Sequence, residues 1–302
     1  MEIQLGAIGI DIGGTKIGLG FVNPLGKMLE HLILPTPPSY AETLNVIVNA
    51  CQRLIESYSP ASIGVGLAGQ IDSATGSVLF APNLDWRHVP FKSDLHAALH
   101  LPVNILNDVR AATWAEWLYG AGREEDNFIC MFIGTGIGGG IVVNGQLLSG
   151  ASNTCGEIGH MAIEINGRPC TCGSLGCLEA YAGGWAISEI YKQTIQTDPL
   201  SLISAKEVIE AAIEGHLIAQ QVLEKAKNAL AIGIANLVNI LNPSKVILGG
   251  GIGFAIPDLI PYLSNKVAHH ALTAATRNFQ IVIAELREHA GIVGAAAYSM
   301  KQ

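Results

Sequence analysis

Two apolar segments, each interrupted by a glycine-rich turn, constrain the fold of this chain more than any other feature. The first reads LGAIGIDI, GGTK and IGLGFVN from residue 5, and the second reads ICMFIGTGIGGGIVVNG from residue 129. An apolar run, a Gly-rich turn and a second apolar run together predict a β-hairpin. Two such hairpins favour two domains of related design through internal duplication, although any two β-hairpins share this much pattern.

Strands and helices alternate around these hairpins, which predicts an α/β fold. Helices are expected over residues 41–57, 93–100, 109–122, much of 185–241, 257–271 and 289–300. Strands are expected over 62–69, 102–108, 244–252 and 279–286, with a hairpin over 70–80. Pro82 and Pro90 predict a loop over residues 81–91. We place a small N-terminal α/β domain at residues 1–110, with the C-terminal helix 289–302 as a candidate to complete it. A larger C-terminal α/β domain with the cysteine-bearing loop follows at residues 111–288.

The composition excludes several classes of protein. The 302 residues suffice for two hydrophobic cores, with 49% apolar and 14% charged residues. The formal charge is −8 and the 17 Lys and Arg are scattered, so no nucleic-acid partner is expected. The N-terminus lacks the basic region of a signal peptide, and no apolar run reaches about 18 residues, the length of a membrane span. We therefore expect a cytoplasmic protein with no membrane partner, in a compartment where clustered cysteines more often bind metal than form disulfides.

The glycine-rich turns could hold a nucleotide. DIGGTK (11–16) has neither the spacing of a P-loop nor a following helix. Its backbone N–H groups could still bind phosphate oxygens, and Asp11 could hold Mg²⁺ directly or through water. GTGIGGG (134–140) and GGG (249–251) offer two further turns. Each turn alone is explained by the backbone freedom of glycine, but three of them after apolar strands suggest a nucleotide held between two lobes.

Asn107 and Asp108 stand where a predicted strand ends and a helix begins. Asp108 at this place could be a helix N-cap. A carboxylate at a strand end that faces a ligand could equally be a general base. The residues alone leave both interpretations open.

Cys170, Cys172 and Cys177 with His160 form a Cys₃His set that is typical of tetrahedral zinc. A disulfide is disfavoured in the cytoplasm, and C-x-C is not the C-x-x-C of thioredoxin-like redox motifs. A closed four-ligand site is structural, so the expected role is to fix the loop that carries Glu157, His160 and Glu179. The other three cysteines are expected to be small buried apolar residues.

LGAIGIDIGGTKIGLGFV, LND, GTGIGGGIVVNG and the GEIGH…GRPCTCGSLGCLE block together resemble the ROK family of repressors, uncharacterised reading frames and sugar kinases. The resemblance runs in order over most of the chain. It implies an actin-like ATPase (ribonuclease H-like) fold of two α/β domains around a cleft, and ATP-dependent phosphorylation of a hexose, usually on the 6-hydroxyl. It also suggests a homodimer.

The resemblance assigns expected roles to residues of this chain. Asp108 corresponds to the catalytic base. The expected hexose contacts are Asn83, Asn107, Asp108, Glu157, His160 and Glu179. The expected phosphate, Mg²⁺ and adenosine contacts are Asp11, Gly13, Gly14, Thr15, Lys16, Gly134, Thr135, Gly136, Gly138, Gly249 and Gly250. The expected zinc ligands are His160, Cys170, Cys172 and Cys177, with the second ring nitrogen of His160 left to touch the sugar.

Three functions stay open within this resemblance. The first is a glucokinase-type enzyme that uses ATP, Mg²⁺ and a structural Zn²⁺. The second is a kinase of N-acetylmannosamine or N-acetylglucosamine, because pocket volume beside an acetamido group cannot be read from sequence. The third is a sugar-binding or regulatory protein without catalysis. For a DNA-binding repressor we expect an N-terminal helix-turn-helix and a basic surface, and the first hairpin starts within ten residues of Met1.

Overall fold

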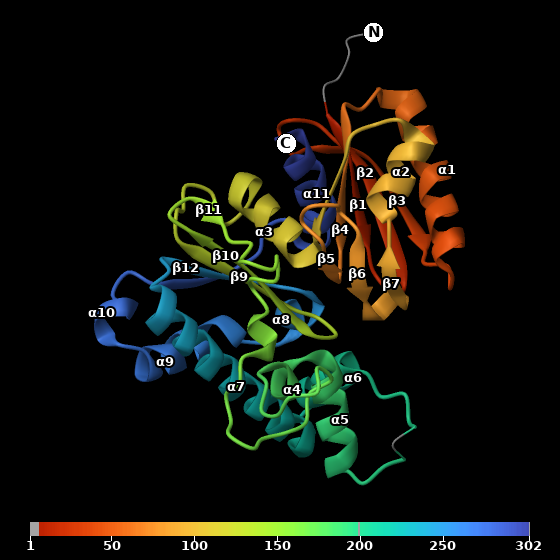
Figure 1. Cartoon of the computed structure of the whole chain (residues 1–302). Coiled ribbons are helices and arrows are strands. Elements are labelled where there is room, and N and C mark those ends of the chain that lie inside the picture. The colour runs from red at the N-terminus through yellow and green to blue at the C-terminus, as the bar shows by residue number, and fades with distance from the viewer. Residues whose placement is uncertain (1–5, 199, 302) are drawn as a thin grey trace. The chain divides into compact units, whose positions relative to one another are not determined.

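The computed structural model describes residues 6–198 and 200–301 (Figure 1). The chain divides into two compact units. Unit 1 comprises the residues up to Glu124, Leu147–Cys155 and the residues from Glu285 onward, and unit 2 comprises Glu125–Gln146 and Gly156–Ala284. The chain therefore passes from one unit to the other after Glu124, Gln146, Cys155 and Ala284. The domain limits expected from the sequence, at residues 110 and 289, stay a prediction, because compactness alone does not define an independently folding domain.

The main sheet of unit 1 has the strand order β3-β2-β1-β4-β8. Its strands are β1 (Ala7–Ile12), β2 (Lys16–Val22), β3 (Met28–Pro35), β4 (Ser62–Leu67) and β8 (Val103–Asn107). β1 and β2 form the first predicted hairpin, which is confirmed, and β4 and β8 run parallel to β1. The carboxyl ends of β1 and β8, which carry Asp11 and Asn107, therefore lie at the same edge of the sheet.

The two faces of this sheet differ because of the alternation in AIGIDI. Ile8, Ile10 and Ile12 join a buried core with residues of α1 (Tyr40–Tyr58) and α2 (Phe91–Leu99). On the other face Gly9 meets α11 (Ala290–Met300), where a Cβ would lie 2.0 Å from a helix carbonyl oxygen. α11 in turn packs along α3 (Asp108–Tyr119) (Figure 1). Small residues on one face therefore allow a close helix–sheet contact.

A second, three-stranded sheet of unit 1 corrects the prediction of a loop over residues 81–91. It contains β5 (Gln70–Ile71), β6 (Val78–Ala81) and β7 (Trp86–Val89), with a 3₁₀ turn at Pro82–Leu84. The prolines begin the 3₁₀ turn and follow β7, so the strand fits between them. Trp86 drives this pairing because its side chain is buried in the core. The sequence prediction also missed β3 in the main sheet.

The sheet of unit 2 repeats the arrangement of a hairpin beside two parallel strands. Its order is β11-β10-β9-β12-β13. The strands are β9 (Phe128–Ile133), β10 (Ile137–Val143), β11 (Gln146–Leu147), β12 (Lys245–Gly249) and β13 (Gln280–Ile283). β9 and β10 form the second predicted hairpin, and β12 and β13 are parallel to β9 and to each other.

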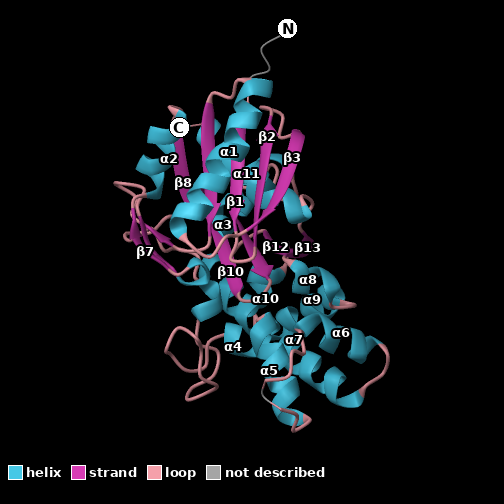
Figure 2. Ribbon diagram, turned by 90° about the vertical axis from the view of Figure 1, so that its right-hand side faces the viewer, coloured by secondary structure: helices cyan, strands magenta, loops and turns pink. Residues whose placement is uncertain are grey.

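The helices of unit 2 gather around the long helix α7 (Leu217–Leu241). Its packing partners include α4 (Glu179–Ala182), α5 (Gly184–Thr194), α6 (Ala205–Ile213) and α9 (Leu259–His270). Short helices α8 (Gly251–Ala255) and α10 (Thr273–Thr276) follow β12 and α9. The segment between β11 and α4 is mostly loop (Figure 2). Over the two described stretches of the chain, no helix combines the length and apolar character that a membrane crossing needs.

Candidate functional site

The expected site residues form two sets, one in each unit. Unit 1 holds Asp11, the 13–16 turn, Asn83, Asn107 and Asp108. Unit 2 holds the 134–138 turn, Glu157, His160, Glu179, the 249–250 turn and the three cysteines.

The 13–16 turn of unit 1 joins β1 to β2 and is fixed by Thr36, a residue that the sequence prediction missed. The Gly13 N–H donates to the Lys16 carbonyl over 3.0 Å. The Thr36 hydroxyl donates to the Gly13 carbonyl over 2.7 Å, and the Thr36 N–H donates to the Thr15 carbonyl over 3.0 Å. Thr15 and Lys16 stay exposed at the tip. The turn is thus preorganised, with its tip open to a ligand.

Asn83 lies directly against this turn, although the two are separated by about 70 residues in the sequence. A Cβ on Gly14 would lie 2.7 Å from the Asn83 carbonyl oxygen, so only glycine admits this contact without a shift. The 3₁₀ turn at Pro82–Leu84 leaves Asn83 exposed. An expected phosphate contact and an expected sugar contact are therefore neighbours within unit 1.

Asp11 and Asp108 influence each other across the carboxyl edge of the unit 1 sheet. Burial, and then the negative charge of Asp108, raise the pKa of Asp11 to about 7, against the opposing effect of Lys16. Gly291, in the first turn of α11, approaches the Asp11 carboxylate so closely that a Cβ there would lie 2.6 Å from an oxygen. Two acidic groups close enough for one to shift the pKa of the other are typical of a site that binds a cation or moves a proton.

Asn107 supplies a side-chain cap of α3. The Asn107 carboxamide oxygen accepts the N–H groups of Val109, over 3.0 Å, and Arg110, over 3.2 Å. Asp108 is the first helical residue and is half-buried. The capping function that the sequence allowed for Asp108 is therefore filled by its neighbour. The Asn107 amide nitrogen is the part of that side chain that could donate to a sugar hydroxyl.

Glu179 fixes the 134–137 turn of unit 2. Its buried carboxylate accepts the Ile137 N–H over 2.8 Å and the Trp185 indole N–H over 3.1 Å. The Thr171 hydroxyl approaches the same carboxylate at 3.4 Å. A carboxylate has about four acceptor positions, so a further donor could still bind. The structure therefore gives Glu179 a role that the sequence did not reveal, which is to join the 134–137 turn to the cysteine loop.

The start of α5 adds backbone bonds to the same turn. The Gly184 N–H donates to the Gly134 carbonyl over 2.9 Å, and the Trp185 N–H donates to the Thr135 carbonyl over 3.0 Å. Thr135 stays exposed, while Gly138 lies within β10 opposite Phe132. Like the turn in unit 1, this turn is fixed by hydrogen bonds to a neighbouring segment, and its tip is exposed.

The 249–250 turn ends β12 and begins α8. Gly250 has φ 83°, and a Cβ there would lie 2.3 Å from the Ile133 carbonyl oxygen. A left-handed backbone in such close contact needs glycine. The turn thus lies at the end of β9, beside the 134–137 turn in the same unit.

His160, Cys170, Cys172 and Cys177 come together as the sequence predicted. Their four candidate ligand atoms all lie within 4.8 Å of one another. Cys172 Sγ is 3.7 Å from Cys177 Sγ, and Cys170 Sγ is 3.7 Å from His160 Nδ1. Zinc–sulfur bonds of about 2.3 Å in a tetrahedron place neighbouring ligands about 3.8 Å apart. The donor set and its spacing therefore fit zinc.

Glu157 precedes the 3₁₀ turn Ile158–His160 and His160 ends it, and both side chains are exposed. Ile158 and Gly159, between them, are buried against the hairpin of unit 2. Because the His160 Nδ1 atom faces the cysteines, the Nε2 atom is the nitrogen that could meet another ligand.

The sequence profile of the ROK family matches residues 7–302. The chain belongs to the ROK family. It is 34% identical to the glucokinase of Thermotoga maritima, over 97% of each chain. It is also 28% identical to the xylose repressor of Caldicellulosiruptor bescii, over 96% of this chain and 77% of the repressor. A ROK family glucokinase from Streptomyces griseus, solved in complex with glucose and AMPPNP, superposes with a TM-score of 0.85 at 34% identity and covers 98% of this chain and all of that one.

The ROK structures confirm the expected fold class, the actin-like ATPase fold. The two hairpin-bearing sheets described above are its two α/β halves.

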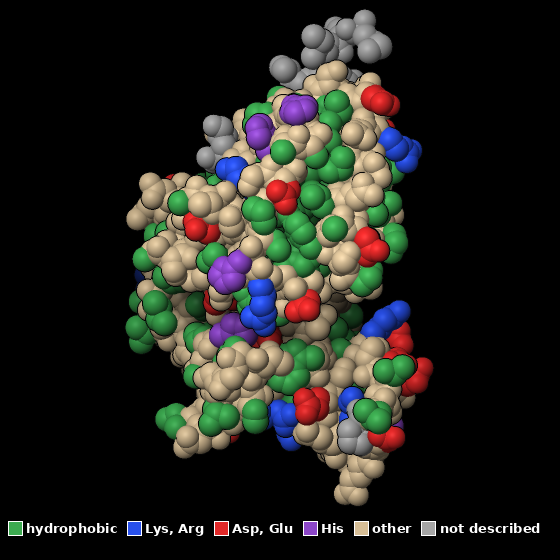
Figure 3. Space-filling view, turned by 45° about the vertical axis from the view of Figure 1, so that its right-hand side comes forward, with side chains coloured by type: hydrophobic (Ala, Val, Ile, Leu, Met, Phe, Trp, Pro, Cys, Tyr) green, Lys and Arg blue, Asp and Glu red, His purple; other side chains and the backbone are tan. Residues whose placement is uncertain are grey.

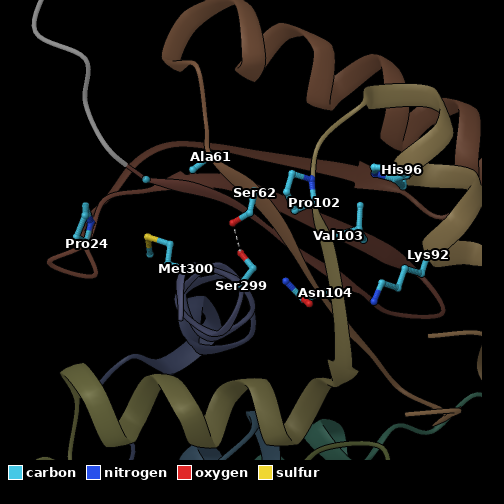
Figure 4. A pocket seen from close by; sticks show the side chains of 11 residues that line it. Pro24, Ala61, Ser62, Lys92, His96, Pro102, Val103, Asn104, Ser299 and Met300 are labelled. Atoms are coloured by element: carbon cyan, nitrogen blue, oxygen red, sulfur yellow. Dashed lines mark hydrogen bonds between the residues drawn. The ribbon is translucent and has the colours of Figure 1, made fainter. Parts of the chain in front are cut away.

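A pocket of about 780 Å³ in unit 1 lies away from the expected site residues (Figure 4). It opens where β4 and β8 begin, and Ser62, Lys92, His96, Asn104 and Ser299 are among its lining residues. Asp11 and Asp108 lie at the other ends of the strands of this sheet. Ligands of open α/β sheets bind at the carboxyl ends of strands, so the geometry favours the Asp11–Asp108 edge over this pocket.

Charged side chains are interspersed over the face of the molecule seen in Figure 3. No large basic patch covers that face among the described residues, in keeping with the net charge of −8.

Proposed function

We propose that this ROK protein is an ATP-dependent hexose kinase that phosphorylates the 6-hydroxyl of glucose. The observation that carries the proposal is the arrangement of Asn107 and Asp108 at the start of α3. Asn107 caps the helix, and Asp108 stands beside Asp11 at the carboxyl edge of the sheet. A carboxylate at the carboxyl edge of the sheet, beside a second acidic side chain and near a turn that could bind phosphate, suits a general base.

In this proposal Asp108 accepts the proton of the sugar 6-hydroxyl as the oxygen attacks the γ-phosphorus of ATP. The bond from that phosphorus to the β,γ-bridging oxygen breaks, and ADP leaves. The turns at 13–16 and 134–138 present backbone N–H groups to phosphate oxygens, and the turn at 249–250 lies near the adenosine. Positioning and neutralisation of charge supply most of the catalysis in phosphoryl transfer.

The acidic edge fits a divalent cation, because Asp11 is a hard oxygen ligand beside the phosphate turn. Asp11 would hold Mg²⁺, directly or through water, and the ion would supply neutralisation of phosphate charge. Lys16, whose charge already acts on Asp11, would add to that neutralisation.

The sugar would be held by amides and carboxylates, since each hydroxyl both donates and accepts a hydrogen bond. Asn83, Asn107 and Asp108 would contribute from unit 1, and Glu157, His160 and Glu179 from unit 2. Zinc bound by the three cysteines and His160 Nδ1 would orient the ring so that Nε2 meets a sugar hydroxyl. The metal would shape the binding site and take no part in the chemistry.

The test is ADP release from Mg-ATP with glucose, mannose, fructose, N-acetylglucosamine and N-acetylmannosamine, compared by kcat/KM. A preference for glucose supports the proposal, and a preference for an acetamido sugar reassigns the substrate. The xylose repressor among the relatives makes a sugar-responsive regulator the second candidate. That candidate would lead if no sugar raised ADP release above the Asp108→Asn control while calorimetry still detected sugar binding.

A further inference from the structure

Glu116, in the last turn of α3, is a buried carboxylate that none of the functions above explains. Its exposed fraction is 0%. Burying a charged group is costly unless it is fully hydrogen-bonded. A negative charge near the C-terminus of a helix is also opposed by the helix dipole. A residue kept at this position against both effects needs a compensating structural or functional role.

The partners of Glu116 lie where the chain passes between the two units. Its Oε2 atom accepts the N–H of Ala121 over 2.8 Å and the N–H of Glu285 over 3.1 Å. Its Oε1 atom accepts the N–H of Leu286 over 2.8 Å. Ala121 stands shortly before the crossing after Glu124, and Glu285 immediately follows the crossing after Ala284. One carboxylate thus ties together, within unit 1, the segment that leads to unit 2 and the segment that returns from it.

We call the hydrogen bonds of Glu116 with residues 121, 285 and 286 the clasp, and neighbouring residues support it. The Glu116 carbonyl accepts the N–H groups of Gly120, over 3.1 Å, and Gly122, over 2.9 Å. A Cβ on Gly120 would lie 2.1 Å from the Glu116 carboxylate, so glycine leaves the space that this carboxylate occupies. Arg123 and Glu285 also form an ion pair of 3.5 Å, but both are mostly exposed, and such pairs contribute little.

The same helix also anchors the segment between the other two crossings. Arg110, in the first turn of α3, is buried and donates to the Asn153 side chain, whose amide donates to the Ile71 carbonyl over 3.0 Å. Asn153 lies in residues 147–155, the segment of unit 1 that ends two residues before Glu157. The helix that begins at Asp108 therefore also bonds to chain segments next to all four crossings.

We propose that Glu116 is a positioning residue of the phosphoryl transfer. Its clasp holds two chain segments, the one that leads into unit 2 and the one that returns from it, against the helix that carries the proposed base. Without this clasp, the two connecting segments would no longer be held to the helix that carries Asp108. This inference rests on the proposed kinase function, and phosphoryl transfer is sensitive to small displacements of the reacting groups.

The test compares Glu116→Gln with two controls in steady-state kinetics, well below the unfolding temperature of each variant. The glutamine keeps the shape, but its amide nitrogen cannot accept an N–H group. We expect kcat to fall by about tenfold to a hundredfold, a range typical of misplaced reactants. Arg123→Ala, which removes only the exposed ion pair, should stay within about twofold of the wild-type kcat.

Ser299→Ala is the control for loss of stability alone. It removes the buried Ser62–Ser299 hydrogen bond of 2.9 Å, which lies in unit 1 at the other end of α11. We expect a lower unfolding temperature with an unchanged kcat. A wild-type kcat in Glu116→Gln, or an equal loss of kcat in Ser299→Ala, would overturn the inference.

A second variant covers the case in which Glu116→Gln does not fold. Gly120→Ala keeps the carboxylate but places a methyl group where it now lies. It should lower kcat in the same way, and a wild-type kcat in this variant contradicts the inference.

Hydrogen exchange separates a failure of this inference from a failure of the kinase assignment. Slow exchange of the Ala121, Glu285 and Leu286 N–H groups in the wild type, lost in the variant, shows the clasp even if no sugar is phosphorylated. If the wild type is an active kinase but these amides exchange equally fast in both proteins, the clasp is wrong and the kinase assignment stands.

Discussion

At the residue scale, Asn107 caps α3, and the adjacent Asp108 is the proposed general base. The Asn107 side-chain oxygen accepts hydrogen bonds from two N–H groups of α3, which have no partner within the helix. The carboxylate then belongs to the acidic edge shared with Asp11.

We expect Asp108→Asn to keep sugar affinity and to lose turnover. The amide preserves the shape but cannot accept the hydroxyl proton, and general bases contribute about 10²–10⁴-fold. Single-turnover rates with Mg-ATP, together with the glucose Kd from calorimetry, check this prediction. A rate within tenfold of wild type would remove Asp108 as the base.

Asp11 predicts a pH dependence of stability. Its folded-state pKa is about 7 and its ordinary value is 3.8, so between these values the folded protein binds the proton more tightly than the unfolded chain. The stabilisation is complete below about pH 4 and is lost as the pH rises through about 7. In the absence of nucleotide and Mg²⁺, Asp11→Asn should therefore melt several degrees above wild type at pH 8.5 and close to wild type at pH 4.5. Parallel melting curves for the two proteins across this range would contradict the prediction.

Sequence could identify residues whose chemistry is local and could not identify those whose partners are distant. The cysteine set and the Asn107–Asp108 pair lie within short stretches, so their composition reveals them. Thr36 and Glu116 have ordinary sequence neighbourhoods. Their importance comes from partners at positions 13 and 15, and at 285 and 286, which only the folded chain brings near.

At the scale of elements, the cysteine loop and the 134–137 turn form one assembly through Glu179. Thr171, within the loop, and Ile137, at the end of the turn, share its carboxylate. Disorder in the loop should therefore reach the 134–137 turn as well as Glu157 and His160, the proposed sugar contacts.

We expect Cys172→Ala to lose zinc, raise the KM for glucose by about tenfold or more, and raise the KM for ATP by less. The magnitude is set by the loss of about 10–100-fold in metal affinity or activity that mutations around metal sites typically cause. Elemental analysis and steady-state kinetics are the measurements. Cys155→Ala is the matched control, because Cys155 lies outside the cluster and should leave the zinc content unchanged. A zinc-free Cys172→Ala protein with the wild-type KM for glucose would show that the metal has no part in the sugar site.

Helices and strands with a strong apolar periodicity can be predicted from the sequence, and strands that form because they pair with a distant strand cannot. Residues 41–57 were expected to be helical, and α1 spans Tyr40–Tyr58 with a Ser39 cap. β7 was missed because Pro82 and Pro90 dominate the local pattern, while the pairing with β6 and the burial of Trp86 decide the outcome. β3, with its mixed side chains and partly exposed positions, becomes a strand because it pairs with β2.

At the scale of the whole molecule, the proposed sugar contacts are divided between two units that each have their own sheet and core. Folded protein that binds a ligand is stabilised by about 2.7 kcal/mol at a ligand concentration of 100 times Kd. A sugar held by residues of only one unit would protect mainly that unit. A sugar held by Asn83 and Asn107 from unit 1 and by Glu157 and His160 from unit 2 should protect both.

We therefore expect saturating glucose to slow hydrogen exchange in β1 of unit 1 and in β9 of unit 2 alike. These strands are buried central strands of their sheets, so their amides report opening of each unit. The Asp108→Asn protein should show the same protection, because it is expected to keep sugar affinity without turnover. Sorbitol at equal concentration controls for the general effect of polyols on stability. Protection confined to one unit would mean that the sugar is held by that unit alone and that the contacts proposed for the other are wrong.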